Sequence, residues 1–222
     1  LPEGFALACV LEREDPRDAF VSPRFESLAA LPPSARVGTS SLRRVVQLLA
    51  ARPDLQIEPL RGNLDTRLRK LDEGQYDAIV LAAAGLKRLG LAERIRATFE
   101  PQYMLPAAGQ GALGIEVRAD DAALLQALSL MVHHPTWLAA HAERAVSRGL
   151  GGSCSVPLAA FAEFDGPTMR LYTRLGDSAQ PTRAVLAAQV QAPVRNVAEA
   201  LALAEQAVAA LRAQGAAQYL GA

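Results

Sequence analysis

The sequence contains very few cysteines and carries no net charge. Its 222 residues include two cysteines, Cys9 and Cys154, which are too few for a disulfide scaffold and are typical of a reducing compartment. The 23 basic side chains balance 23 acidic ones, which excludes the broad positive surface of a nonspecific nucleic-acid-binding protein. We therefore expect a cytoplasmic protein that has no nucleic-acid partner.

Several other features are missing. No apolar run approaches the roughly 18 residues that a membrane helix needs, so we expect no membrane partner. No Walker pattern is present, which argues against a phosphate ligand. The histidines, His133, His134 and His141, lack further ligands at metal-binding spacing, so we predict helix-surface positions for them and no metal site. Half of the residues are hydrophobic, which argues against disorder and supplies buried cores.

The start of the sequence is also unusual. It begins with LPEG instead of Met, and it has neither the basic nor the apolar region of a secretion signal. It then enters a strand-like stretch at residues 5–14 directly. We therefore expect the chain to be a fragment or a processed product.

The hydrophobic pattern of the first half predicts alternating strands and helices. The predicted strands cover residues 36–39, 55–60 and 77–82, and the helices cover residues 41–52, 63–73 and 84–89. The first helix has apolar residues at i, i+3, i+4 and i+7 spacing. This βαβαβ order implies a parallel sheet with right-handed crossovers. A loop rich in Pro and Ser is predicted from residue 15 to about residue 35, and an irregular stretch follows the third helix.

The second half has a different pattern, and the change falls near residue 133. Residues 112–118 are a predicted strand, followed by helices at 121–131 and 136–148. Beyond them we predict three strands of a meander and one long alanine-rich helix, at residues 156–163, 168–174, 184–191 and 194–214. The boundary therefore separates an α/β part from an α+β part.

Basic residues follow the first predicted strand closely. Arg43 and Arg44 come directly after Thr39, Ser40 and Ser41, where the strand turns into a helix, although the first turn of a helix ordinarily favours acidic residues. Hydroxyls, free amide N–H groups and two cations at a helix N-terminus predict an anion site. The alternative is that the two arginines pair with a neighbouring loop.

Further arginines fall near the same edge of the predicted sheet. Arg61 precedes the second helix, Arg67 lies one turn inside it, and Arg88 follows the third strand. Ligands bind at the carboxyl ends of parallel strands, so these side chains are expected to converge on one crevice. Residues 17–105 hold 14 basic and 10 acidic side chains, which favours an anionic small ligand. Arginine makes up 21 of the 23 basic residues, and a GC-rich genome is the alternative reason for that bias.

The two cysteines occupy different contexts. Cys154 lies in the glycine-rich loop GGSCSVP, residues 151–157, where an accessible and reactive thiol is expected. Cys9 lies inside an apolar strand, where a buried thiol is expected. Cys154 is therefore the candidate for modification.

Taken together, these stretches resemble the porphobilinogen deaminase (hydroxymethylbilane synthase) family. The matching motifs are EREDPRDAF (12–20), VGTSSLRR (37–44), LRGN (60–63), DTRL (65–68), AGLKRLG (84–90), GQGA (109–112) and the cysteine loop. They occur in order and cover essentially the whole chain. The loop has Gly-Ser-Cys where the family commonly has Gly-Gly-Cys, a small change that leaves the assignment of Cys154 intact.

The resemblance implies a transferase of tetrapyrrole (haem) biosynthesis. Such an enzyme condenses four porphobilinogens head to tail into hydroxymethylbilane and releases ammonia. The resemblance implies a dipyrromethane cofactor that is joined by a thioether to Cys154. The positions that would bind the cofactor are Thr39, Ser41, Arg43 and Arg44, and those that would bind substrate carboxylates are Arg61, Arg67 and Arg88. The small-molecule partner would be porphobilinogen, and the full-length enzyme would be a monomer.

The fold implied is α/β, with type II periplasmic-binding-protein-like domains of parallel or mixed sheets. A C-terminal α+β domain with a three-stranded antiparallel sheet follows them. Residues 1–16 with 112–130 would be the remnant of domain 1, residues 17–105 domain 2, and residues 134–222 domain 3. The family's proton-handling aspartate would precede Leu1, so the chain by itself is expected to be inactive.

A carboxylate-binding module of the same fold without catalysis is the alternative function. That alternative explains the arginines but leaves Cys154 without a role. The intact mass separates the two, since a deaminase carries two pyrrole units on Cys154.

Overall fold

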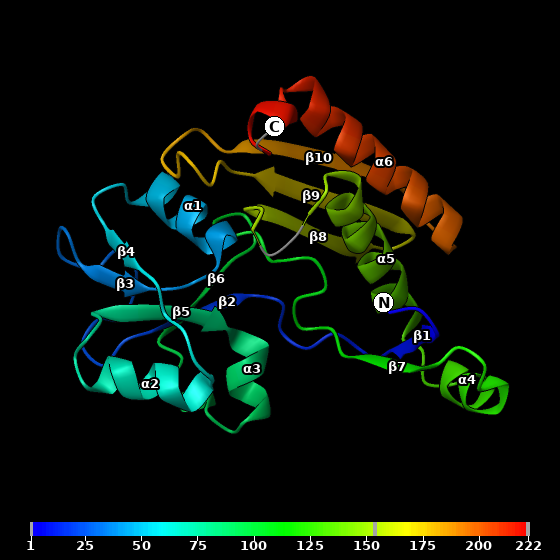
Figure 1. Cartoon of the computed structure of the whole chain (residues 1–222), viewed down its shortest axis with the longest axis horizontal. Helices are drawn as coiled ribbons and strands as arrows, with labels where there is room; N and C mark the ends of the chain where they lie inside the picture. Colours follow the sequence, from blue (N-terminus) through cyan, green and yellow to red (C-terminus); the bar gives the residue numbers. More distant parts are fainter. Residues whose placement is uncertain (1, 153–154, 221–222) are drawn as a thin grey trace.

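The computed structural model describes residues 2–152 and 155–220, which form three separate β-sheets with helices packed on them (Figure 1). One sheet has five strands of mixed direction, one has two strands and one has three antiparallel strands. This arrangement confirms the predicted fold class, a mixed α/β protein with a separate three-stranded antiparallel sheet. Among the described residues, every helix is too short or too polar to span a bilayer.

The five-stranded sheet has the strand order β4-β3-β5-β2-β6. Its strands are β2 (Asp18–Val21), β3 (Arg36–Gly38), β4 (Gln56–Glu58), β5 (Ala78–Ala82) and β6 (Ala97–Phe99). Strand β3 pairs in parallel with both β4 and β5, as the βαβαβ pattern predicts. Strand β2 runs antiparallel between β5 and β6. The mixed direction therefore comes from β2, whereas β6 runs in the same direction as β3, β4 and β5.

Strands β2 and β6 correct two expectations. The sequence pattern predicted a loop where β2 lies and an irregular stretch where β6 lies. All four residues of β2 are buried, because this interior strand is covered by helices on both faces of the sheet. A strand of four residues is too short to show a period, and its place in the sheet depends on partners far along the chain.

Helices cover both faces of this sheet. Helix α1 (Leu42–Ala51) packs on one face, and α2 (Leu64–Asp72) and α3 (Ala83–Arg88) pack on the other, as Figure 1 shows. Leu48 of α1 is buried with Val37 and Val80, whereas Leu68 and Leu86 are buried on the opposite side. The result is a three-layer αβα unit in which α1 stands alone on its face.

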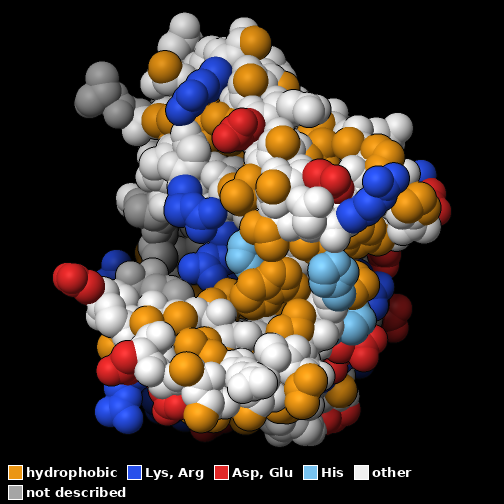
Figure 2. All heavy atoms as spheres, turned by 90° about the vertical axis from the view of Figure 1, so that its right-hand side faces the viewer, with side chains coloured by type: hydrophobic (Ala, Val, Ile, Leu, Met, Phe, Trp, Pro, Cys, Tyr) orange, Lys and Arg blue, Asp and Glu red, His pale blue; other side chains and the backbone are white. Residues whose placement is uncertain are grey.

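Strands β1 (Phe5–Val10) and β7 (Gly114–Arg118) form the antiparallel two-stranded sheet, and helix α4 (Ala122–Ser129) packs near it. Hydrophobic side chains remain exposed on this unit. They are Phe5, Leu113, Leu124, Leu130 and Met131, with exposed fractions between 42% and 90%. Figure 2 views the molecule from the side that carries α4 and shows hydrophobic side chains spread over its lower half.

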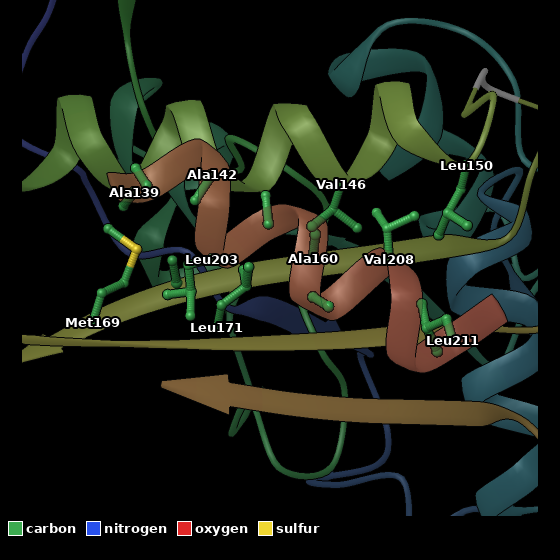
Figure 3. Packing of buried hydrophobic residues seen from close by; sticks show 14 of the residues in the cluster. Ala139, Ala142, Val146, Leu150, Ala160, Met169, Leu171, Leu203, Val208 and Leu211 are labelled. Atoms are coloured by element: carbon green, nitrogen blue, oxygen red, sulfur yellow. The ribbon is translucent and has the colours of Figure 1, made fainter. Parts of the chain in front are cut away.

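The C-terminal part is an open-faced sandwich. Its antiparallel strands are β8 (Leu158–Asp165), β9 (Thr168–Leu175) and β10 (Leu186–Pro193), with β9 in the centre. Helices α5 (His134–Gly149) and α6 (Val197–Ala213) cover one face, and Figure 3 shows their side chains meeting those of the sheet. Small residues such as Ala142 and Ala207, both fully buried, allow the two helices to approach each other closely.

The predicted division into three domains remains a prediction, and two observations support it. The core of the C-terminal part is a cluster separate from the two clusters that flank the five-stranded sheet. The pairing of β1 with β7 joins the two chain segments that were assigned to domain 1.

Candidate functional site

The amino-terminal end of α1 lies where β3 ends. Ser41 is the N-cap residue, but within the described part of the chain its side chain makes no capping hydrogen bond, and the first turn contains no acidic residue. The backbone N–H of Ser41 donates to Oγ1 of Thr39 at 3.3 Å, and Oγ of Ser40 donates to the carbonyl of Leu60 at 2.9 Å. The positive end of the helix dipole is therefore not neutralised locally and favours an anion.

Arg43 and Arg44, in the first turn of α1, are buried, with exposed fractions of 4% and 9%. Both bind the carboxylate of Asp18, which is fully buried at the start of β2. Arg43 Nη1 and Nη2 donate to Oδ2 and Oδ1 of Asp18 at 2.7 and 3.1 Å, and Arg44 Nε donates to Oδ1 at 2.9 Å. The two arginines thus pair with a strand of the sheet, and one carboxylate serves both.

Further bonds hold the two guanidinium groups. Arg43 also donates to the carbonyl of Leu105 at 2.7 Å and to Oε1 of Gln110 at 3.1 Å. Arg44 donates to the carbonyl of Val80 at 3.1 Å. The Nε atom of Arg43 is buried and has no hydrogen-bond partner among the described residues. A buried donor without a partner costs free energy, so this atom is suited to meeting a ligand oxygen.

Charge explains the protonation state of the cluster. Burial acts to raise the pKa of Asp18, but the positive charges of Arg43 and Arg44 outweigh it and lower this pKa below its ordinary value of 3.8. Burial also lowers the pKa of Arg44, as do the charges of Arg43 and Arg67, and Asp18 opposes them. Two guanidinium groups and one carboxylate leave a net charge of +1.

A cleft of about 560 Å³ opens beside this cluster, between the five-stranded sheet unit and the C-terminal part. Polar residues at and near the start of α1 form one wall together with Arg67 of α2. The lining residues are Ser40, Ser41, Leu42, Arg43, Arg44, Arg67, Ala107, Ala108, Ser147, Gly152, Val156, Leu158 and Ala160. This lining contains three cations and no carboxylate, so the cleft is suited to an anionic molecule.

Gly152 and Ser147, from the C-terminal part, also line the cleft. The backbone N–H of Gly152 donates to the carbonyl of Ser147 at 2.7 Å. A Cβ atom at this position would lie 2.5 Å from Oγ and 2.7 Å from the carbonyl oxygen of Ser147, so this position requires glycine. Cys154, the predicted attachment residue, lies outside the described residues. Cys9 is fully buried in β1, which confirms the expectation of a buried thiol.

The other predicted arginines differ in position. Arg67 is half-buried, lines the cleft and donates from Nε to the carbonyl of Gly62 at 2.8 Å. Arg61 and Arg88 are exposed and are not among the lining residues. Arg88 donates to the carbonyl of Gly111 at 2.9 Å. The structure therefore brings Arg67 near the amino-terminal end of α1 and leaves Arg61 and Arg88 outside the cleft.

Two residues of the cluster have no assigned role in the sequence prediction. Asp18 binds both arginines, and Nε2 of Gln110 donates to Oδ1 of Asp18 at 3.1 Å and to the carbonyl of Pro16 at 2.6 Å. Both belong to motifs that carry the family resemblance, but they lie 92 positions apart in the sequence. No local pattern signals their contact. Among the described residues, no three His, Cys, Asp or Glu side chains are grouped to hold a metal ion.

Comparison with known proteins gives two family matches. Residues 1–126 match the family model described as porphobilinogen deaminase, dipyromethane cofactor binding domain. Residues 137–213 match the model of the porphobilinogen deaminase C-terminal domain.

Two relatives are porphobilinogen deaminases. The protein from Albidiferax ferrireducens is 62% identical over 213 residues, which are 96% of this chain and 67% of the relative. The protein from Paraburkholderia phytofirmans is 58% identical over 217 residues, which are 97% of this chain and 63% of the relative. The chain thus spans about two thirds of the length of these curated relatives.

Solved structures show weaker similarity. A putative methionine-binding lipoprotein from Bacillus subtilis superposes with a TM-score of 0.42 at 15% identity, over 59% of this chain and 62% of that one. A periplasmic substrate-binding protein of an ABC transporter from Coxiella burnetii superposes with a TM-score of 0.40 at 17% identity, over 62% and 65%.

Proposed function

The chain belongs to the porphobilinogen deaminase family, and on this basis we propose that it is the larger part of an enzyme that makes hydroxymethylbilane. In this reaction four porphobilinogens join head to tail, water takes the final position, and four molecules of ammonia leave. The growing product would be built on a dipyrromethane that is joined to Cys154. The proposal covers the whole enzyme, of which the chain spans about two thirds.

The cationic cleft is the observation that carries the proposal. Each pyrrole unit of the substrate bears an acetate and a propionate, so a chain of pyrroles is a polycarboxylate. Arg43, Arg44 and Arg67 line the cleft, and guanidinium groups bind carboxylates through charge-assisted hydrogen bonds. The unpartnered Nε of Arg43 and the uncompensated end of α1 add donors that a carboxylate satisfies.

A dipyrromethane fits the residues that are present. Gly152 lines the cleft two positions before Cys154, so a group on that thiol and the three arginines would belong to one site. Arg43, Arg44 and Ser41 would hold its carboxylates, and Arg67 would hold those of incoming units. When bound, the dipyrromethane supplies the electron-rich pyrrole carbon to which the first unit is added.

The residues of the cleft would bind and orient the pyrrole units. Fixed guanidinium groups hold the carboxylates of two successive units, which brings the reacting carbons together without a further loss of freedom. The group that transfers protons would come from elsewhere, because Asp18 is already bound to two arginines and none of the described residues that line the cleft is a carboxylate. We therefore also propose that an aspartate upstream of Leu1 transfers the proton when ammonia leaves.

Arg61 and Arg88 have a different place in the proposal. Both are exposed. Arg61 precedes α2, which carries Arg67, and Arg88 ends α3 and binds the carbonyl of Gly111. We propose that they meet the carboxylates of the later units, which extend beyond the cleft as the product grows. Thr39 is buried and would act through its bond to Ser41. A cytoplasmic location and a monomeric full-length enzyme are further proposals, supported by the low cysteine content for the location and by the resemblance for the oligomeric state.

The decisive prediction is that Cys154 carries the two pyrrole units. Full-length enzyme is purified, and its intact mass and its cysteine peptides are measured. The Cys154 peptide should carry the added mass, and Cys154→Ala should abolish both that mass and turnover.

Cys9→Ala is the matched control and should keep both the mass and turnover, since the fully buried thiol of Cys9 has no access to a substrate. An unmodified Cys154 peptide from active enzyme would falsify the attachment. Carboxylate binding without added mass or turnover would instead favour the non-catalytic binding module.

A further inference from the structure

Asp18 occupies a position that the binding of substrate does not by itself explain. It is an acidic residue, fully buried, and it binds two of the arginines that line a cleft suited to anions. Its carboxylate would repel a bound carboxylate, so an anion site without it would carry a higher positive charge. This repulsion has to be offset by a favourable effect of Asp18 on the two arginines.

The contacts of Asp18 indicate what that contribution is. Arg43 binds it through two nitrogens, Arg44 binds it through Nε and Nη2, and Gln110 binds the same oxygen, Oδ1, through Nε2. Two guanidinium groups that are close together in a buried space repel each other unless a negative charge lies between them. Asp18 supplies that charge from the interior strand β2, which pairs with β5 on one side and β6 on the other.

The orientation of Arg43 follows from these bonds. Its Nη1 and Nη2 atoms are fully engaged by Asp18, Leu105 and Gln110. The remaining donor, Nε, is buried and has no partner among the described residues. Asp18 thus turns one edge of the guanidinium group toward the sheet and leaves the other donor for a ligand.

We propose that Asp18 is a positioning residue that holds Arg43 and Arg44 as a preformed receptor for one carboxylate of a pyrrole ligand. The inference rests on the proposed function, because that function names the ligand. Removing the charge of Asp18 has two opposite effects on an anion. It raises the positive charge of the site, which strengthens binding, and it releases the two arginines, which weakens binding. The proposal states that the second effect is larger.

The experiment compares Asp18→Asn and Asp18→Glu with the unchanged chain. Porphobilinogen is titrated calorimetrically into each protein at a temperature at which circular dichroism shows that the protein is folded. Both variants should bind with a Kd raised about tenfold or more, since the loss of one well-placed charge-assisted hydrogen bond is worth about this much. Glutarate, a plain dicarboxylate, is titrated in parallel.

Asp77→Asn is the matched control. Asp77 directly precedes β5 of the same sheet, pairs with Arg24 and accepts a hydrogen bond from the backbone N–H of Arg36 at 2.8 Å, but it does not line the cleft. It should leave Kd unchanged even if it lowers the melting temperature, so a general loss of stability is separated from positioning.

The outcomes separate the positioning role of Asp18 from the proposed function. Tighter or unchanged binding of both probes by Asp18→Asn overturns the positioning role. If glutarate binds in an Asp18-dependent manner and porphobilinogen does not bind, the positioning role stands and the proposed function fails. If the unchanged chain binds neither probe, both are overturned.

Discussion

At the scale of single residues, the two arginines that bind Asp18 decide what this carboxylate contributes to stability. Its folded-state pKa lies below the ordinary value of 3.8, because Arg43 and Arg44 favour the ionised form more than burial disfavours it. A carboxyl group whose pKa is depressed on folding stabilises the protein above its unfolded-state pKa, and this contribution is lost as the pH falls through the folded-state value. Between the folded-state and the unfolded-state pKa of Asp18, the unfolded chain binds the proton more readily than the folded chain does.

We therefore predict acid sensitivity that depends on Asp18. The melting temperature of the unchanged chain should hold above about pH 4 and fall steeply below it. The melting temperature of Asp18→Asn should be lower at neutral pH and should change less between neutral and acid pH. Thermal unfolding followed by circular dichroism across this range measures both curves.

Asp165→Asn is the control for this comparison, because Asp165 forms an exposed pair with Arg170 and such pairs contribute little. Its curve should follow that of the unchanged chain. Parallel curves for Asp18→Asn and the unchanged chain would show that the carboxylate is not the group that titrates.

At the scale of secondary-structure elements, helices α1 and α6 begin in contrasting ways. The N-cap of α6 is Asn196, whose side chain accepts a hydrogen bond from the N–H of Glu199 at 3.0 Å. The side chain of Glu199 in turn accepts one from the N–H of Arg195 at 2.6 Å. The N-cap of α1, Ser41, makes no such bond within the described residues. One helix start is completed by its own sequence, and the other is left for a ligand.

This contrast predicts different costs for the two cap residues. Asn196→Ala should lower the free energy of unfolding by about 1 kcal/mol, the usual cost of losing a side-chain cap. Ser41→Ala should change it by less than about 0.5 kcal/mol, because no capping bond is removed. Urea unfolding measures both values. An equal loss for the two variants would show that Ser41 caps α1 in solution.

At the scale of the whole molecule, two contacts connect the parts around the cleft. Glu143 of α5 is fully buried and accepts two hydrogen bonds from Nη2 of Arg13, at 2.9 and 3.0 Å. It also accepts bonds from the backbone N–H groups of Gly109 and Ala162. Arg13 and Gly109 lie in the two chain segments that connect the β1–β7 sheet to the five-stranded sheet. Both segments are therefore bonded to the C-terminal part. Removal of one member of such a buried pair leaves an unpaired charge and is strongly destabilising.

The second contact lies beside the cluster itself. Arg174 of β9 donates to Oε1 of Gln47 in α1 at 2.9 Å and to the carbonyls of Gln102 and Tyr103. Gln47 also binds the backbone of Leu105, whose carbonyl accepts from Arg43. Arg174 thus connects the C-terminal part to the unit that carries the cationic wall, through one bond to a side chain and two bonds to the backbone.

The complete reaction requires more than these walls. We predict that the 222-residue chain forms hydroxymethylbilane at least about 10²-fold more slowly than the same chain preceded by the upstream segment of the Albidiferax ferrireducens relative, since a positioned acid–base group contributes about 10²–10⁴ in rate. The exposed hydrophobic residues around β1, β7 and α4 give a place for such a segment to pack. A steady-state assay of both proteins measures the ratio. Turnover by the chain alone within tenfold would place the essential carboxylate inside it.

The sequence by itself determined the order of the periodic elements and indicated an anionic ligand. The periodic segments became α1, α2 and the parallel strands β3, β4 and β5, because these elements are stabilised by local spacing and burial. The hydroxyls and arginines of residues 39–44 indicated an anion, since helix ends and guanidinium groups have the same preference in any fold.

The tertiary structure alone decided which groups meet. It placed the unpredicted strand β2 between β5 and β6 and so brought Asp18 against Arg43 and Arg44, 25 and 26 positions away. It also selected Arg67 for the cleft and left Arg61 and Arg88 outside it. Contacts between distant segments depend on strand order and on the packing of whole units, and no local pattern records either of them.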